Sequence, residues 1–152
     1  MRSFKNNILI ILAIVFVGIQ FVPTMHNQSQ VVPKTDFKLI YEVPDNIANL
    51  LKESCYDCHS SNTRYPWYSN IQPVAWFLES HIKKGKKELN FSDFGNYSTR
   101  RQKSKLRAII NQISDNEMPL ASYTFLHHGA RLSTLEKKAL MNYAEHIKDS
   151  LN

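Results

Sequence analysis

The segment Cys-Tyr-Asp-Cys-His at residues 55–59 constrains this chain more than any other part of it. Cys55 and Cys58 stand three positions apart and His59 follows directly, which is the spacing of a c-type haem attachment motif. In such a motif the two thiols form thioethers with the porphyrin vinyl groups, and the histidine binds the iron from one face. The chain has no further cysteine, so no disulfide framework competes with this interpretation.

Two other cysteine chemistries remain as alternatives. A dithiol redox pair usually sits in an α/β context, whereas no convincing strand pattern appears in this sequence. A structural zinc site needs four ligands, and the chain has no second cysteine pair, although His127 and His128 can contribute nitrogen ligands. We therefore predict one haem c per chain, attached through Cys55 and Cys58, with His59 as the proximal iron ligand.

Met118 is the candidate for the sixth iron ligand. It lies 59 residues after His59, and the following Pro119 stiffens the loop because proline cannot extend a helix. A thioether ligand raises the reduction potential relative to a second imidazole, which suits electron transfer. Filling a gap in the core is the alternative role of Met118. His81, on the apolar stripe of an expected helix, is the alternative sixth ligand.

The N-terminal segment differs in character from the rest of the chain. Arg2 and Lys5 precede an apolar run, residues 8–22, that is interrupted by Gly18 and Gln20. We predict a membrane anchor or signal over residues 1–23, and prefer an uncleaved anchor because no small-residue cleavage site follows. The basic start places the N-terminus in the cytoplasm of a bacterium and the body in the periplasm, at its inner membrane. Residues 24–43 are predicted to be a linker, and residues 44–152 the haem-binding domain.

Four segments of the body have the periodicity of amphipathic helices. They are residues 45–53, 73–87, 99–114 and 134–151. Gly85 suits the end of the second helix, and Ser133 with Glu136 matches a capping box at the start of the fourth. Because no strand pattern accompanies them, the sequence predicts an all-α domain.

The charge of the body is unevenly distributed. Beyond residue 30 the chain carries 17 basic and 13 acidic residues, and nine of the basic ones fall between Lys83 and Arg107. A basic face can dock an acidic redox partner or lipid headgroups, or can be a solvated surface without a partner. Nucleic acid is not expected as a partner of an exported protein.

A dense aromatic group follows the haem motif. Tyr65, Trp67 and Trp76 are candidates to pack against the haem, because large aromatic side chains cover flat cofactors and can donate hydrogen bonds. Arg64 is a candidate partner for a haem propionate, since a guanidinium matches a carboxylate geometrically. Ordinary core or surface roles are the alternatives for all four residues.

Several segments in order resemble the bacterial haem-binding domain family, whose members carry a single c-type haem. The matching segments are Cys55–Ser60, Asn62–Tyr68, Ile71–Trp76, His81–Ile82 with Gly85, Leu89–Ser92 and Met118–Leu120. They extend from about residue 43 to the C-terminus. The resemblance implies a cytochrome c-like helical fold with covalent haem on Cys55 and Cys58, iron on His59, and Met118 at the family's Met-Pro position.

Together these features predict a membrane-tethered periplasmic monohaem cytochrome that transfers single electrons rather than catalysing a reaction. A haem-based redox or gas sensor is the alternative, and holds if the sixth iron position is open or its ligand is easily displaced. A haem peroxidase is a weaker alternative, because it needs an open iron and a distal acid–base residue, for which His81 is the interior candidate.

Overall fold

Four amphipathic helices form the body of the protein, close to the boundaries that the sequence predicts. The protein is represented by a computed structural model that describes residues 2–29 and 31–151, without the side chains of residues 2 and 3. The helices are α1 (Arg2–Ile19), α2 (Phe37–Ile40), α3 (Asp45–Ser54), α4 (Tyr56–His59), α5 (Val74–Glu88), α6 (Thr99–Ser114), α7 (Ala121–Leu126) and α8 (Thr134–Ser150), with short 3-10 turns η1 (Trp67–Asn70), η2 (Phe91–Asn96) and η3 (His128–Ala130). No strand forms in these ranges, where β-pairing is limited to an isolated bridge between Gln28 and Asn62. The prediction of an all-α fold is confirmed.

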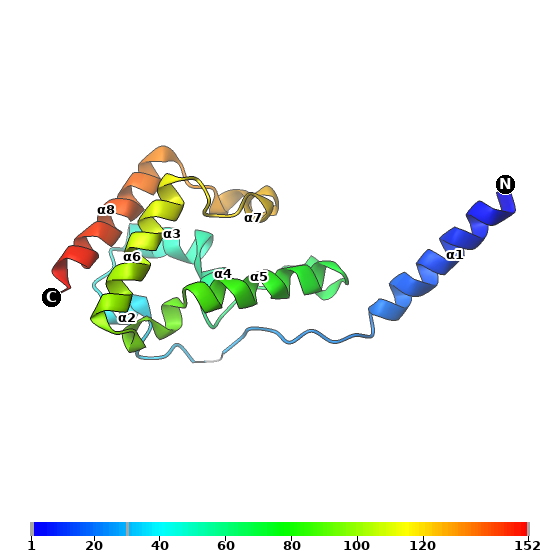
Figure 1. The fold of residues 1–152 in the computed structure, drawn as a ribbon, viewed down its shortest axis with the longest axis horizontal. Coiled ribbons are helices and arrows are strands. Elements are labelled where there is room, and N and C mark those ends of the chain that lie inside the picture. The colour runs from blue at the N-terminus through cyan, green and yellow to red at the C-terminus, as the bar shows by residue number, and fades with distance from the viewer. Residues whose placement is uncertain (1, 30, 152) are drawn as a thin grey trace.

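The core lies where α6 and α8 pack side by side and α3 meets α8 (Figure 1). The apolar stripes of these helices supply most of it, because residues spaced by three or four positions share one helix face. An aromatic group from α2 and η2 closes the core, with the rings of Phe37 and Phe94 centred 5.0 Å apart. The buried apolar residues of the core cluster are Phe37, Ile47, Leu51, Tyr56, Phe91, Phe94, Tyr97, Leu106, Ile113, Leu140, Ala144 and Ile147.

The haem motif occupies the junction between α3 and α4. Helix α3 buries Ile47 and Leu51 in the core, and its last turn closes with a 2.9 Å hydrogen bond from the Cys55 N–H to the Leu51 carbonyl. The chain then bends and forms the single turn α4, which packs against α5. The core therefore fixes the position from which both cysteines and the histidine emerge.

The segment between α1 and α3 is more structured than the predicted linker. Asp36 and Phe37 are 2 % exposed, and the short helix α2 forms within residues 24–43. Further upstream, the side-chain amide of Asn27 donates to the Ser60 carbonyl and to the Thr63 hydroxyl, at 2.8 and 2.9 Å. Two parts of the predicted linker are thus packed on the domain, Asn27 through hydrogen bonds to the loop after the haem motif and Phe37 through burial in the core.

The expectation of an N-terminal membrane helix needs correction. The predicted segment does form a helix, α1, which projects away from the body (Figure 1). Its first two turns contain Lys5, Asn6 and Asn7, so its apolar part starts at Ile8. Among the residues that the structure describes, no helix combines the length and the apolar character that a membrane crossing requires.

Candidate haem-binding site

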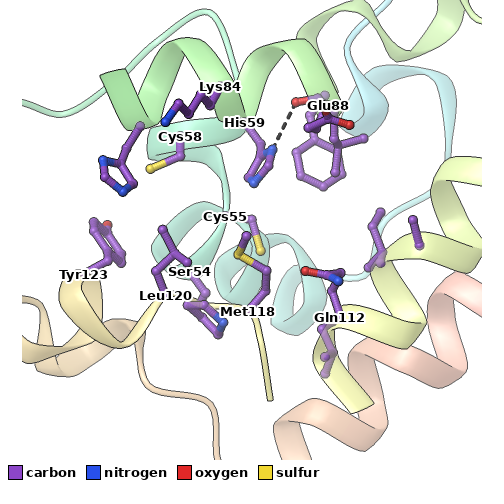
Figure 2. A pocket seen from close by; sticks show the side chains of 18 of the residues that line it. Ser54, Cys55, Cys58, His59, Lys84, Glu88, Gln112, Met118, Leu120 and Tyr123 are labelled. Carbon is purple, nitrogen blue, oxygen red and sulfur yellow. Dashed lines mark hydrogen bonds between the residues drawn. The ribbon is translucent and has the colours of Figure 1, made fainter. Parts of the chain in front are cut away.

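A cavity of about 450 Å³ lies among α4, α5, α6 and the segment that leads into α7. It is lined by Ser54, Cys55, Cys58, His59, His81, Lys84, Gly85, Glu88, Leu89, Phe91, Lys105, Ala108, Ile109, Gln112, Ile113, Met118, Pro119, Leu120 and Tyr123. In Figure 2, Cys58 and His59 enter from one side, whereas Met118, Leu120 and Tyr123 enter from the opposite side. The fold therefore brings the motif and both candidate sixth ligands, Met118 and His81, to one cavity.

A backbone carbonyl fixes the ring of His59. Its Nδ1 lies 3.0 Å from the Leu89 carbonyl oxygen, the contact drawn as a dashed line in Figure 2. Because a carbonyl can only accept, Nδ1 carries the proton and Nε2 keeps its lone pair. Burial lowers the pKa of His59, which also favours the neutral ring. This is the tautomer and orientation that an iron-binding histidine requires.

The two cysteines are free thiols within the structure. Burial, reinforced by the neighbouring Cys58, raises the pKa of Cys55 to about 12. Burial and then the negative charge of Asp57 raise the pKa of Cys58 to about 11. Both side chains are therefore neutral thiols at pH 7, and both line the cavity.

Helix α5 approaches the motif closely because residue 85 is glycine. A Cβ added at Gly85 would lie 2.7 Å from the Cys58 carbonyl oxygen and 3.3 Å from the Cys58 Cβ. The sequence suggested that Gly85 ends its helix, but α5 continues to Glu88. The role of Gly85 is thus close contact with the haem motif.

A Schellman turn at the end of α6 positions Met118. The N–H of Glu117 donates to the Gln112 carbonyl at 2.9 Å, and the N–H of Asn116 donates to the Ile113 carbonyl at 3.2 Å. Asn116 has a φ of 60°, a conformation that asparagine tolerates better than most residues. The Met118 N–H also donates to the Gln112 carbonyl, at 3.1 Å. The chain therefore leaves α6 with Met118 directed to the cavity.

The remaining histidines differ in their access to the cavity. His81 lines it, and its Nδ1 donates to the Phe77 carbonyl at 2.8 Å, which leaves Nε2 as an acceptor. His127 does not line it. Its Nδ1 donates to the Tyr123 carbonyl at 3.1 Å and its Nε2 lies 3.2 Å from the Tyr68 hydroxyl. His127 is thus engaged on both nitrogens outside the cavity, and no cluster of three or more metal-binding side chains occurs among the described residues.

The four residues predicted to surround the haem lie elsewhere. The Arg64 guanidinium binds Asp57 at 3.1 Å and Glu53 at 2.7 Å, so it is committed to protein carboxylates instead of a propionate. Tyr65 stacks on His26 and its hydroxyl accepts from the backbone of Asn27. Trp67 is 77 % exposed and Trp76 is 38 % exposed. None of the four lines the cavity, because the chain turns away from the motif after Ser60.

Other cavity residues escaped the sequence prediction, although helical spacing contained a signal for some of them. On α5, Gly85 and Glu88 continue the stripe of His81 at four and seven positions. On α6, Lys105 precedes Ile109 by four positions and Gln112 by seven. Residues at these spacings share one face of a helix. The charged and polar residues that extend each stripe therefore lie on the face that lines the cavity. Tyr123, on the short helix α7, had no comparable signal.

The residues present fit a haem. Two thiols, an imidazole with a free Nε2 and a thioether line the same cavity, which is the donor set of a c-type haem. The Ser54 hydroxyl is buried beside Cys55 without a hydrogen-bond partner in the described part of the chain, consistent with a partner that the polypeptide does not supply. The volume falls in the range of cofactor cavities, about 300–1,000 Å³.

Comparison with known families points to the same cofactor. The sequence model of the haem-binding domain family matches residues 14–146. Neither a curated protein nor a solved structure matches the chain significantly. The family match thus includes the whole stretch from Ser54 to Tyr123, which supplies all of the cavity residues.

Proposed function

This chain belongs to the haem-binding domain family, and from that premise we propose that it is a c-type cytochrome that attaches one haem covalently and carries single electrons. The observation that supports the proposal is the meeting of Cys55, Cys58, His59 and Met118 at one cavity. Met118 is far from the other three along the chain. Together the four residues offer thiol, imidazole and thioether groups, the combination that electron-transfer haem proteins use.

Each residue has a distinct role in the proposal. Cys55 and Cys58 would hold the haem through two thioether bonds, one from each S–H group to one vinyl group. His59 offers Nε2 as the proximal ligand, held in place by the Leu89 carbonyl. Met118 offers its thioether from the opposite side. When bound, haem supplies a one-electron redox centre whose potential depends on these ligands and on burial.

The test is the spectrum of the full-length chain after expression with a haem-attachment system. We expect haem that resists acid–acetone extraction, a low-spin ferric spectrum, and the long-wavelength band of thioether ligation. Met118→Ala should give a high-spin ferric spectrum, whereas Met141→Ala, a matched change on α8, should keep the wild-type spectrum. Extractable haem would contradict covalent attachment, and an unchanged Met118→Ala spectrum would remove Met118 from the site.

The proposal includes export to the periplasm. Arg2 and Lys5 precede an apolar stretch in α1 that starts at Ile8, the order of a targeting segment, and covalent haem attachment takes place on the outer side of the bacterial inner membrane. A fusion of alkaline phosphatase to the C-terminus should be active in cells. Replacing Ile11 and Val15 by Asp should abolish this activity, and retained activity would argue against export through this segment.

The proposal also includes an acidic redox partner. Lys84 and Lys105 line the cavity from α5 and α6, and further basic residues on the same helices, including Lys83, Lys87 and Arg107, are exposed. A positive surface around a redox centre favours fast encounter with a negative partner. The electron would then cross where the partner meets the mouth of the cavity.

A haem-based sensor is the second candidate function, and one observation favours it. Helix α7, which follows Met118 by three positions, buries none of its residues, so the segment that carries the sixth ligand is held by little packing. Carbon monoxide added to the ferrous protein separates the two functions. Rapid and complete displacement of the thioether favours a sensor, whereas resistance to displacement favours an electron carrier.

A further inference from the structure

Helix α7 and the segment before it form the wall of the cavity that carries Met118. Hydrophobic packing holds this wall weakly: α7 buries none of its six residues, and Phe125 and Leu126 are 71 % and 55 % exposed. The Schellman turn fixes only the start of the segment, at Asn116 and Glu117. Something other than apolar burial must therefore fix its far end.

Polar contacts supply that attachment: Arg131 donates to the Thr124 carbonyl, His127 contacts the Tyr68 hydroxyl, and a hydrogen bond from Tyr123 reaches the haem motif. The Tyr123 hydroxyl lies 2.6 Å from Oδ2 of Asp57 and 3.4 Å from the Glu53 carbonyl. Asp57 stands between the two cysteines of the haem motif and is 7 % exposed. A hydrogen bond to a buried carboxylate is among the stronger ones in proteins. The contact thus links the wall that carries Met118 directly to the turn that carries His59.

Asp57 is itself held rigidly. Its Oδ1 accepts from the backbone N–H and the Nε–H of Arg64, both at 3.1 Å, and its Oδ2 accepts from the Arg64 guanidinium at 3.1 Å. Its backbone carbonyl accepts from the Thr63 hydroxyl at 2.6 Å. Arg64, which the sequence suggested as a propionate partner, instead orients the carboxylate that receives Tyr123.

The Tyr123 ring is positioned on its other side by His127. Their ring centroids lie 4.2 Å apart with an interplanar angle of 21°. Burial and the neighbouring Asp57 raise the pKa of Tyr123, so the hydroxyl keeps its proton and remains a donor. The aromatic stack and the hydroxyl therefore make separable contributions, and only the hydroxyl reaches the haem motif.

We propose that the hydrogen bond between Tyr123 and Asp57 is a latch that holds Met118 over the iron-binding side of the cavity. Tyr123 and Asp57 are positioning residues, since neither is a ligand. The inference rests on the proposed function, because it assumes that Met118 is the sixth ligand. With the latch closed, an external ligand can reach the iron only after the 118–123 segment moves away.

The test measures imidazole binding to the full-length, haem-loaded ferric protein. Tyr123→Phe keeps the ring on His127 and removes the hydroxyl. We expect it to bind imidazole at least tenfold more tightly than wild type, equal to about 1.4 kcal/mol, with a weakened thioether band. Tyr143 on α8 donates its hydroxyl to the Glu42 carbonyl, away from the cavity lining. Tyr143→Phe should therefore bind imidazole like wild type.

The outcomes separate the latch from the function on which it rests. Equal imidazole affinity in wild type and Tyr123→Phe, together with loss of the thioether band in Met118→Ala, would overturn the latch and leave the cytochrome proposal intact. A wild-type protein without the band would overturn both. In a double-mutant cycle, adding Tyr123→Phe to Asp57→Asn should change the affinity less than Tyr123→Phe does in the wild type, and full additivity would contradict the latch.

A second measurement covers the case in which Tyr123→Phe does not load haem. Amide hydrogen exchange across residues 119–127 in the haem-free full-length chain reports local opening directly. We expect these amides to exchange at least tenfold faster in Tyr123→Phe than in wild type, with α6 and α8 unchanged. Equal exchange at residues 119–127 would overturn the latch.

Discussion

Gly85 shows how one residue decides the geometry of the candidate site. A methyl group there would meet the Cys58 carbonyl oxygen at 2.7 Å, and the opposing atom is backbone that cannot move without shifting the motif. We expect Gly85→Ala to destabilise the haem-free chain by about 1–3 kcal/mol, the usual cost of overpacking, despite the better helix propensity of alanine. Urea unfolding and the ratio of attached haem to protein measure the effect.

Gly129 provides the matched control for Gly85. A Cβ added at Gly129 would have no neighbour within 4 Å, so Gly129→Ala should change the free energy of unfolding by less than about 0.5 kcal/mol. Haem attachment should fall in Gly85→Ala and not in Gly129→Ala. If Gly85→Ala attaches haem normally and is as stable as wild type, α5 can recede from α4 and the close contact has no role.

Asn116 is the second residue whose conformation matters to the site. Its φ of 60° costs a residue with an ordinary Cβ about 1–2 kcal/mol, and glycine nothing. We therefore expect Asn116→Ala to be less stable than Asn116→Gly by about 1 kcal/mol in urea unfolding. Both variants lose the contact between the Asn116 side chain and Lys137, so the comparison isolates the backbone. Equal stability would mean that the turn relaxes and that Met118 is not fixed through it.

The residues of the site differ in how far the sequence could reveal them. Cys55, Cys58 and His59 are adjacent in the chain, so their spacing alone defines a chemistry. Arg64 was predicted as a propionate partner because a guanidinium matches a carboxylate geometrically, but the sequence did not indicate the direction in which the chain turns. That direction depends on Asp57, whose buried carboxylate draws the Arg64 loop to itself. Such a pairing has no sequence signature.

Among the helices, α8 is the one whose start the sequence determines most clearly. The Ser133 hydroxyl accepts from the Glu136 N–H, and the Glu136 carboxylate accepts from the Ser133 N–H at 2.7 Å, which confirms the predicted capping box. Hydrogen bonds from Ser133 lower the pKa of Glu136 below its usual value of 4.5. A lowered pKa means that the charged carboxylate stabilises the folded state above pH 4.5 and loses this effect as the pH falls through the folded pKa.

The capping box can be tested by its pH dependence. Glu136→Gln should be less stable than wild type at pH 7, and the difference should shrink as the pH falls below about 4.5. Ser133→Ala should cost about 0.5–2 kcal/mol at pH 7 and retain part of that loss in acid, because the bond from the Glu136 N–H to the hydroxyl does not titrate. Urea midpoints across pH 3–7 measure both, and a pH-independent difference for Glu136→Gln would contradict the charged cap.

Long and short elements were unequally predictable. The boundaries of α6 agree with the prediction, and those of α3, α5 and α8 differ by one residue at most at either end, because each has a periodic apolar stripe that one core buries. The one-turn helix α2 was missed, since four residues carry too little periodicity and its formation depends on the burial of Phe37. Helix α7 was missed for a different reason: it buries none of its residues, and polar contacts such as that of the Tyr123 hydroxyl with Asp57 hold it in place of an apolar face.

At the scale of the whole molecule, the fold places the candidate site beside its basic surface. Helices α5 and α6 both line the cavity, and each contributes a lysine to it, Lys84 from α5 and Lys105 from α6. Lys86 and Arg101 are engaged with Asn27 and the Tyr97 ring. Lys83, Lys87 and Arg107 are exposed on the same two helices, so α5 and α6 concentrate basic charge that composition alone indicated only as an excess.

A charge-reversal experiment on an electrode tests whether the basic charge of α5 and α6 guides docking for electron transfer. Lys83→Glu, Lys87→Glu and Arg107→Glu combined reverse three exposed charges on α5 and α6. Lys34→Glu, Lys52→Glu and Lys138→Glu combined change the net charge equally but lie outside these helices. On a carboxylate-terminated monolayer, we expect wild type and the second variant to exchange electrons and the first variant to lose most of its current.

Because surface charges are screened over about 10 Å at 0.1 M salt, added salt should weaken the wild-type current. Equal losses in the two variants would show that net charge, and not the basic charge of α5 and α6, governs docking.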